Sequence, residues 1–153
     1  MTHLKIGDKA PDFQAFDESG NEIKPDLFKG RKLIVYFYPK ANTPGCTAES
    51  CNLRDYNKEL QEKGFSIIGV SADNSKNQLK FKENYQLPFP LITDTEKSLI
   101  KAFGAWGKKK LYGKEYDGIF RFTFVINENW EIERIFTKVN TKSHAQEILE
   151  SYK

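Results

Sequence analysis

The length, composition and charge of the chain limit what kind of protein it can be. It has 153 residues, which suits one domain and leaves little room for two, so we expect a single domain over residues 1–153. Twelve Phe, seven Tyr and two Trp are enough for a packed core, which argues against a disordered chain. The net charge of +3 and an isoelectric point of about 8.7 fall short of the value above about 9 that is typical of nucleic-acid-binding domains. No nucleic-acid partner is therefore expected.

The sequence also argues against membrane-spanning, secreted and disulfide-rich classes. The longest apolar run, Leu33–Tyr38, has six residues, whereas a membrane-spanning helix needs about 20. Met1–Asp8 has neither the apolar region nor the small-residue cleavage site of a signal peptide. Two cysteines are too few for a small scaffold held together by disulfides. We therefore expect a cytoplasmic protein that does not enter a membrane.

The first predicted elements form a strand–helix–strand unit. Leu33–Tyr38 is a continuous run of β-branched and aromatic residues, typical of a central strand that is buried on both faces. Thr43 and Pro44 indicate the start of a helix, as its N-cap and first helical residue, and Gly64 indicates its end. Phe65–Val70 is a second buried strand. Together these elements predict a βαβ unit with a right-handed crossover.

Helices and strands continue to alternate up to the C-terminus. The remaining predicted elements, in chain order, are the helix Asn74–Tyr85, the strand Phe89–Ile92, the helix Thr95–Phe103, the strands Ile119–Ile126 and Trp130–Phe136, and the helix Lys142–Tyr152. Asp94 is expected to cap the second of these helices. The lysine-rich segment from Lys108 to Lys114 is expected to be a solvated loop. This order of elements predicts an α/β fold in which helices flank both faces of a mixed central sheet.

Cys46 is the first candidate for a reactive group. It falls in the first turn of the helix that begins at Thr43 and Pro44, where free backbone N–H groups and the helix dipole favour a thiolate over a thiol. Thr43 could direct its hydroxyl toward the sulfur or toward a small oxygen-containing substrate. A buried thiol that serves only as a small apolar side chain is the alternative, and the residues alone leave both interpretations open.

Cys51 lies five residues further along the same predicted helix. On an ideal helix this spacing corresponds to a rise of about 7.5 Å and a turn of about 500°, which leaves the two Cα atoms about 8.6 Å apart. A disulfide requires a Cα separation of at most about 6.8 Å. A disulfide between Cys46 and Cys51 can therefore form only if the first turns of the helix unwind. A packed thiol remains the alternative for Cys51 as well.

Metal binding and simple dithiol exchange fit the sequence less well. The two cysteines, with His3 and His144 at opposite ends of the chain, lack the paired spacing of a zinc site. Dithiol exchange of the thioredoxin type normally uses Cys-x-x-Cys, whereas four residues separate the cysteines of this chain. We expect no metal and no other cofactor.

Several segments carry a resemblance to a known family. The pattern Pro39-x-x-x-Thr43-x-x-Cys46 resembles the active-site motif of peroxiredoxins, which are thiol peroxidases with a thioredoxin-like fold. The longer string from Phe37 to Thr47, together with Cys51, resembles the bacterioferritin-comigratory-protein subgroup, also called the Q type. Further matches extend the resemblance over nearly the full chain, at Gly7–Phe13, Leu53–Asp55 and Gly118–Ile126.

The resemblance implies a role for five residues. Cys46 would be the peroxidatic cysteine, Thr43 would hydrogen-bond the thiolate and the peroxide, and Pro39 would shield the sulfur from bulk water. Arg121 would hold the thiolate and polarise the peroxide. Cys51 matches the resolving cysteine, which would form an intramolecular disulfide that thioredoxin or a similar dithiol protein reduces. The resemblance further implies a monomer that needs no metal, haem or flavin.

Arg121 can also be considered from the sequence pattern. The predicted strand Ile119–Ile126 places Arg121, Thr123 and Val125 on one face. An arginine there either reaches solvent or pairs with an anion. The resemblance favours the second arrangement, because the thiolate of Cys46 would supply the anion.

The sequence thus predicts a peroxidase that reduces hydrogen peroxide and organic hydroperoxides through Cys46 and Cys51. One alternative is a protein disulfide oxidoreductase without peroxide chemistry. Another is a binding or chaperone-like module in which the cysteines are incidental. Consumption of peroxide in the presence of a thiol reductant separates the first hypothesis from both alternatives.

Overall fold

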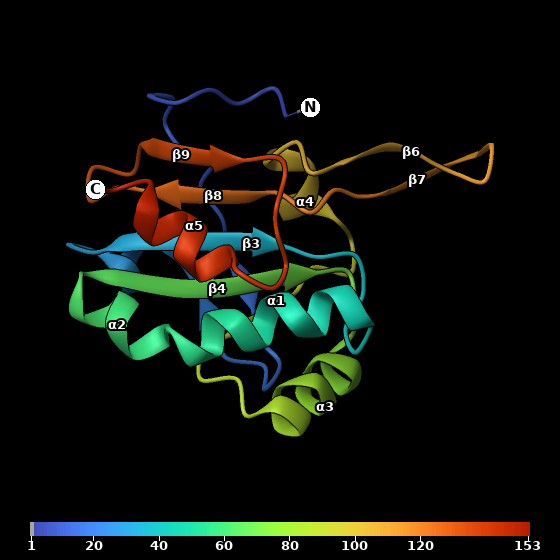
Figure 1. Ribbon diagram of the computed structural model, residues 1–153, viewed down its shortest axis with the longest axis horizontal. Helices are drawn as coiled ribbons and strands as arrows, with labels where there is room; N and C mark the ends of the chain where they lie inside the picture. Colours follow the sequence, from blue (N-terminus) through green and yellow to red (C-terminus); the bar gives the residue numbers. More distant parts are fainter. Residues whose placement is uncertain (1) are drawn as a thin grey trace.

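A computed structural model describes residues 2–153, which form a five-stranded mixed sheet with flanking helices (Figure 1). The strands of this sheet are β3 (Lys32–Phe37), β4 (Phe65–Ser71), β5 (Leu91–Thr93), β8 (Thr123–Ile126) and β9 (Ile132–Phe136). Their order across the sheet is β5-β4-β3-β8-β9, with β3, β4 and β5 parallel and the other two strands joined by antiparallel pairing. The predicted mixed sheet is confirmed, and β3 lies at its centre.

Helices cover both faces of the sheet, as predicted. Those on one face are α1 (Pro44–Asp55), α2 (Asn57–Glu62), α3 (Ser75–Tyr85) and α5 (His144–Glu150), and the helix on the other face is α4 (Ser98–Ala102). Side chains alternate across β3, so that Ile34 and Tyr36 join the core beneath α1, whereas Val35 and Phe37 join the core beneath α4. The smaller elements before the sheet are β1 (Ala15–Phe16), β2 (Glu22–Ile23) and the 3-10 helix η1 (Pro25–Phe28).

The βαβ unit around β3 differs from the prediction in one respect. Thr43 is the N-cap of α1 and Pro44 its first residue, as expected. The helical segment is not continuous, however, because it breaks at Tyr56, where α1 ends and α2 begins. Leu53 of α1 and Leu60 of α2 both reach the same core, so the break leaves the predicted apolar face intact. Gly64 then takes a left-handed conformation, with φ of 91°, and leads into β4.

The prediction of a solvated lysine-rich loop is wrong, and so is that of one strand over residues 119–126. The chain instead forms an antiparallel hairpin of β6 (Trp106–Leu111) and β7 (Lys114–Ile119), which projects from the body of the molecule (Figure 1). Its turn is made by Tyr112 and Gly113, both with positive φ, at 51° and 77°. Two successive residues with positive φ suit a tight hairpin turn, a signal that the lysine-rich composition conceals.

The remaining differences concern the ends of elements. Strand β5 begins two residues later than predicted, and α4 is shorter because Lys97, in a left-handed conformation, is its N-cap. Asp94 still provides a hydrogen-bond acceptor for a free backbone N–H group in the first turns of α4, since its carboxylate accepts a hydrogen bond of 2.7 Å from the N–H of Ile100. Helix α5 is also shorter than the predicted span 142–152. Between residues 2 and 153 no helix combines the length and the apolarity needed to cross a membrane.

Candidate active site

Cys46 is the third residue of α1, in the first turn of the helix, and its side chain exposes no surface. The central strand β3 ends at Phe37, and a short connection leads from it to Thr43 and Pro44, which start the helix beyond the carboxyl end of the strand. The backbone N–H of Thr47 already donates to the carbonyl of Thr43 at 2.8 Å. The sulfur is thereby fixed at the positive end of a 12-residue helix, where a negative charge is stabilised.

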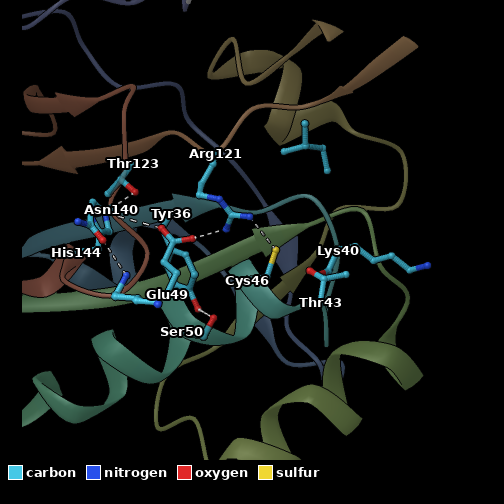
Figure 2. A network of polar contacts seen from close by, with 12 residues as sticks. Tyr36, Lys40, Thr43, Cys46, Glu49, Ser50, Arg121, Thr123, Asn140 and His144 are labelled. Atoms are coloured by element: carbon cyan, nitrogen blue, oxygen red, sulfur yellow. Dashed lines mark hydrogen bonds and ion pairs between the residues drawn. The ribbon is translucent and has the colours of Figure 1, made fainter. Parts of the chain in front are cut away.

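Arg121 provides the cationic neighbour of this sulfur (Figure 2). Its Nη2 donates a hydrogen bond of 3.4 Å to Sγ of Cys46, and its Nη1 donates one of 2.8 Å to Oε1 of Glu49. Burial of Arg121 disfavours its charge, but Cys46 and Glu49 outweigh burial and raise the pKa of the guanidinium. Arg121 therefore stays charged and bridges two groups of the same helix face.

The backbone places Arg121 differently from the prediction. It lies in the connection between β7 and β8 and not within a strand. The N–H of Phe122 donates to the carbonyl of Phe120 at 2.9 Å, which is a three-residue turn centred on Arg121. The rings of Phe120 and Phe122 stack, with centroids 5.1 Å apart. This turn directs the arginine toward the start of α1.

Glu49 also belongs to the site, although it is not among the five site residues predicted from the sequence. It follows Cys46 by one helical turn, exposes no surface, and forms an ion pair with Arg121 at 2.8 Å. Burial raises the pKa of Glu49 to about 7, although Arg121 opposes the shift. The spacing of three residues from Cys46 was the available signal, because residues three apart share a helix face.

Thr43 and Pro39 lie on the segment that leads into α1. The side chain of Thr43 does not cap the helix, because its hydroxyl donates to the carbonyl of Lys40 at 2.7 Å. The lone pairs of that hydroxyl oxygen remain free to accept a hydrogen bond. Pro39 lies two residues after the end of β3 and is half-buried.

Cys51 lies in the second half of α1 and is half-buried, and both cysteines are free thiols. Burial raises the pKa of Cys51, with Arg54 opposing the shift, so this group remains a thiol near neutral pH. The helix runs without interruption from Pro44 to Asp55, so it holds the two cysteines apart in the way that the spacing predicts.

Lys109 of the hairpin also reaches toward this region. Its Nζ donates to the carbonyl of Ile119 at 2.9 Å, which ties β6 to the end of β7 just before Arg121. Burial lowers the pKa of Lys109, with a further contribution from Arg121, while Cys46 opposes the shift. Within the described part of the chain, no three side chains of His, Cys, Asp or Glu lie together in a way that could hold a metal ion.

Comparison with known proteins shows which family the chain belongs to. Residues 6–135 match the AhpC/TSA family. Peroxiredoxin Bcp of Bacillus subtilis is 43% identical over 150 residues, which cover 98% of this chain and 96% of the relative. Peroxiredoxin Bcp of Escherichia coli strain K12 is 40% identical over 149 residues, which cover 97% of this chain and 96% of the relative.

Solved structures of similar proteins share the fold. A mutant of PrxQ from Xylella fastidiosa superimposes with a TM-score of 0.92 at 28% identity, covering 99% of this chain and 97% of the other. The bacterioferritin comigratory protein of Xanthomonas campestris, studied for its alkyl peroxide reduction activity, gives a TM-score of 0.87 at 30% identity over 99% of this chain and 96% of the other. The predicted thioredoxin-like α/β fold is confirmed. The chain belongs to the AhpC/TSA family and, within it, to the peroxiredoxins of the bacterioferritin-comigratory-protein or Q type, which are thiol peroxidases.

Proposed function

We propose that Cys46 is the peroxidatic cysteine of this enzyme and reduces hydrogen peroxide and organic hydroperoxides. The observation that carries the proposal is the contact of 3.4 Å between the Arg121 guanidinium and the buried sulfur at the start of α1. A lone pair of the thiolate attacks the terminal oxygen of the peroxide, so that an S–O bond forms and the O–O bond breaks. The sulfur becomes a sulfenic acid, and the leaving oxygen takes up a proton to give an alcohol or water.

Arg121, Thr43 and Pro39 assist this step. As negative charge passes from the sulfur to the leaving oxygen, the Arg121 guanidinium stabilises the charge at both places. The hydroxyl oxygen of Thr43, whose own proton points to Lys40, accepts a hydrogen bond from the peroxide O–H and orients it. Pro39 limits the access of water to the sulfur.

Cys51 is the resolving cysteine. Its sulfur attacks the sulfenic sulfur of Cys46, a disulfide forms, and water leaves with the sulfenic oxygen. Because the intact helix holds the two Cα atoms about 8.6 Å apart, α1 must unwind locally before this step. A helix end can open at a free energy well below that of global unfolding. Thioredoxin or a similar dithiol protein then reduces the disulfide by exchange.

Peptide mapping after one equivalent of peroxide tests these roles. We expect a linked Cys46–Cys51 peptide in the wild-type protein and no rapid peroxide consumption by Cys46→Ser. Cys51→Ser should consume one equivalent and accumulate sulfenic or over-oxidised Cys46 without a disulfide. A Cys51→Ser protein that does not react with peroxide at all would contradict the assignment of the two cysteines.

We further propose that the chain acts in the cytoplasm as a monomer with one domain over residues 1–153. Both hydrophobic cores pack against the same central sheet, which favours one folding unit. Light scattering of the reduced and the oxidised protein should give the mass of one chain in both states. A dimer in either state would contradict the monomer.

A further inference from the structure

One buried carboxylate oxygen beside the active-site arginine has an unusual environment. Oε2 of Glu49 is fully buried and makes no hydrogen bond to any of residues 2–153. The imidazole of His144, from α5, approaches it with Nε2 at 3.9 Å and is itself fully buried (Figure 2). Glu49 binds Arg121 through its other oxygen, and Arg121 contacts Cys46. His144 is therefore connected to the reactive sulfur through the side chains of Glu49 and Arg121.

The hydrogen bonds of His144 define its protonation. Its Nδ1 lies 2.9 Å from Oε1 of Glu147, and because a carboxylate only accepts, Nδ1 carries a proton and donates it. Burial lowers the pKa of His144, with Glu147 opposing the shift, so the ring is neutral near neutral pH. Nε2 then holds the one free lone pair of the ring, which accepts from the hydroxyl of Thr123 at 2.8 Å, whereas Oε2 of Glu49 lies 3.9 Å away, too far for a hydrogen bond. Among residues 2–153, Oε2 thus has no donor within hydrogen-bond distance, which disfavours a negative charge on it.

The charges around Glu49 also favour the protonated form of its carboxyl group. The groups that face Glu49 are Arg121 from the β7–β8 connection, His144 and Glu147 from α5, Tyr36 from β3, and Cys46 from α1 itself. Only the arginine among them is permanently positive. Two buried anions on one guanidinium are less stable than one, because each loses its hydration. Burial raises the pKa of Glu49 to about 7, in agreement with a carboxyl group that keeps its proton near neutrality.

We propose that Glu49 holds a proton while Cys46 is a thiolate and releases it when the thiolate is consumed, and that the adjacent imidazole of His144 responds to this change of charge. This inference rests on the proposed role of Cys46. In the first step a thiolate, a hydroperoxide and one proton give a sulfenic acid and an alcohol, so one negative charge disappears and one proton is taken up. Arg121 then lacks a counterion until Glu49 ionises, and the proton that Glu49 gives up balances the one that the leaving oxygen requires. His144 does not contact the sulfur and is linked to it only through Glu49 and Arg121.

The imidazole of His144 reports on this proton directly. The chain has two histidines, so long-range proton–nitrogen NMR spectra contain two imidazole systems, and His3→Gln identifies that of His144. We compare pH titrations of the reduced wild type with Cys46→Ser, whose side chain is neutral like the consumed thiolate. The transition at His144 should occur about one pH unit lower in Cys46→Ser, a tenfold change in proton affinity. Identical titrations in the two proteins would overturn the proposal.

Two further variants show whether the titrating proton belongs to Glu49. Glu49→Gln removes the titrating group, so the transition at His144 near pH 7 should disappear. Glu147→Gln is the matched control on the other side of the ring, and in this background the shift caused by Cys46→Ser should persist. If Glu49→Gln does not fold, the comparison of wild type with Cys46→Ser still decides. A Cys46 that reacts with peroxide beside an unresponsive His144 contradicts this inference alone, whereas an unreactive Cys46 contradicts the proposed function.

Discussion

The hydroxyl groups of Tyr36 and Ser50 lie 2.8 Å apart, in a buried hydrogen bond that ties the central strand β3 to helix α1 (Figure 2). Ser50 directly precedes Cys51 in the helix. A second tie follows at Asn52, whose Oδ1 accepts from the backbone N–H of Ala145 at 2.7 Å and joins α1 to α5. The segment around Cys51 is therefore anchored on both sides, and unwinding of α1 must either break these bonds or occur nearer to Cys46.

Ser50→Ala tests whether this anchor slows disulfide formation. The substitution leaves the buried Tyr36 hydroxyl without its partner, so we expect a loss of about 1–3 kcal/mol in the free energy of unfolding. If the anchored segment opens, the disulfide should form faster after the sulfenic acid, about tenfold for each 1.4 kcal/mol by which the helical state is weakened. Rapid mixing with peroxide measures this rate, and Ser151→Ala at the end of α5 is the control. A less stable protein with an unchanged rate would place the unwinding in the first turn, around Cys46.

Arg121→Met should strongly reduce the reaction of Cys46 with peroxide. The variant removes the donor to the sulfur and to Oε1 of Glu49, and loss of one such charge-stabilising donor lowers rates by about 10²–10³-fold. Arg134→Met, at a half-buried position on β9, is the matched control and should react like the wild type. Equal rates in both variants would exclude Arg121 from the chemistry.

Gly45→Ala should increase stability and decrease activity. Gly45 is the second residue of α1, and alanine in a helix is more favourable than glycine by up to about 1 kcal/mol. A Cβ atom at this position, however, would lie 3.1 Å from Nη2 of Arg121, which is the atom that contacts Cys46. The guanidinium must then shift by a few tenths of an ångström, and we expect a fall of about tenfold in the peroxide rate constant. Urea unfolding and single-turnover kinetics measure the two effects, and a fully active variant would contradict the close fit.

The stability of the protein should decrease between about pH 4.5 and pH 7 because of Glu49. Burial raises the pKa of this carboxyl group from 4.5 to about 7 in the folded chain, so the folded state binds the proton more tightly than the unfolded state. The resulting stabilisation is complete below pH 4.5 and is lost as the pH rises through about 7, a change of about 3 kcal/mol. Urea unfolding at a series of pH values should show this fall in the wild type and not in Glu49→Gln. Glu59→Gln, an exposed position on α2, should behave like the wild type.

The sequence was sufficient to place Cys46 and Cys51 because the signals for α1 are local. A buried strand, a capping threonine and a proline at the first helical position determine where the helix starts, and the helix geometry then determines the separation of the cysteines. The position of Arg121 could not be predicted in this way. Its three-residue turn contains neither glycine nor proline, so the apolar pattern of residues 119–126 continues across the bend as if it were one strand.

The environment of Glu49 could not be predicted from the sequence either, for a different reason. The helix spacing puts its side chain on the same face as Cys46, but its partners come from segments far along the chain. Arg121 lies 72 residues later and His144 lies on α5. Only the packing of the β7–β8 connection and α5 against α1 brings these groups together and excludes water, and the displaced pKa of Glu49 follows from that burial.

The unequal exposure of the two cysteines has a consequence for chemical selectivity. Cys46 offers no surface to solvent, whereas Cys51 is half-buried. Bulky alkylating agents therefore reach the less reactive sulfur, that of Cys51, more easily. Only small or slender molecules can approach the more reactive sulfur of Cys46. Size of the electrophile, and not the intrinsic nucleophilicity of the thiolate alone, decides which compounds modify this enzyme.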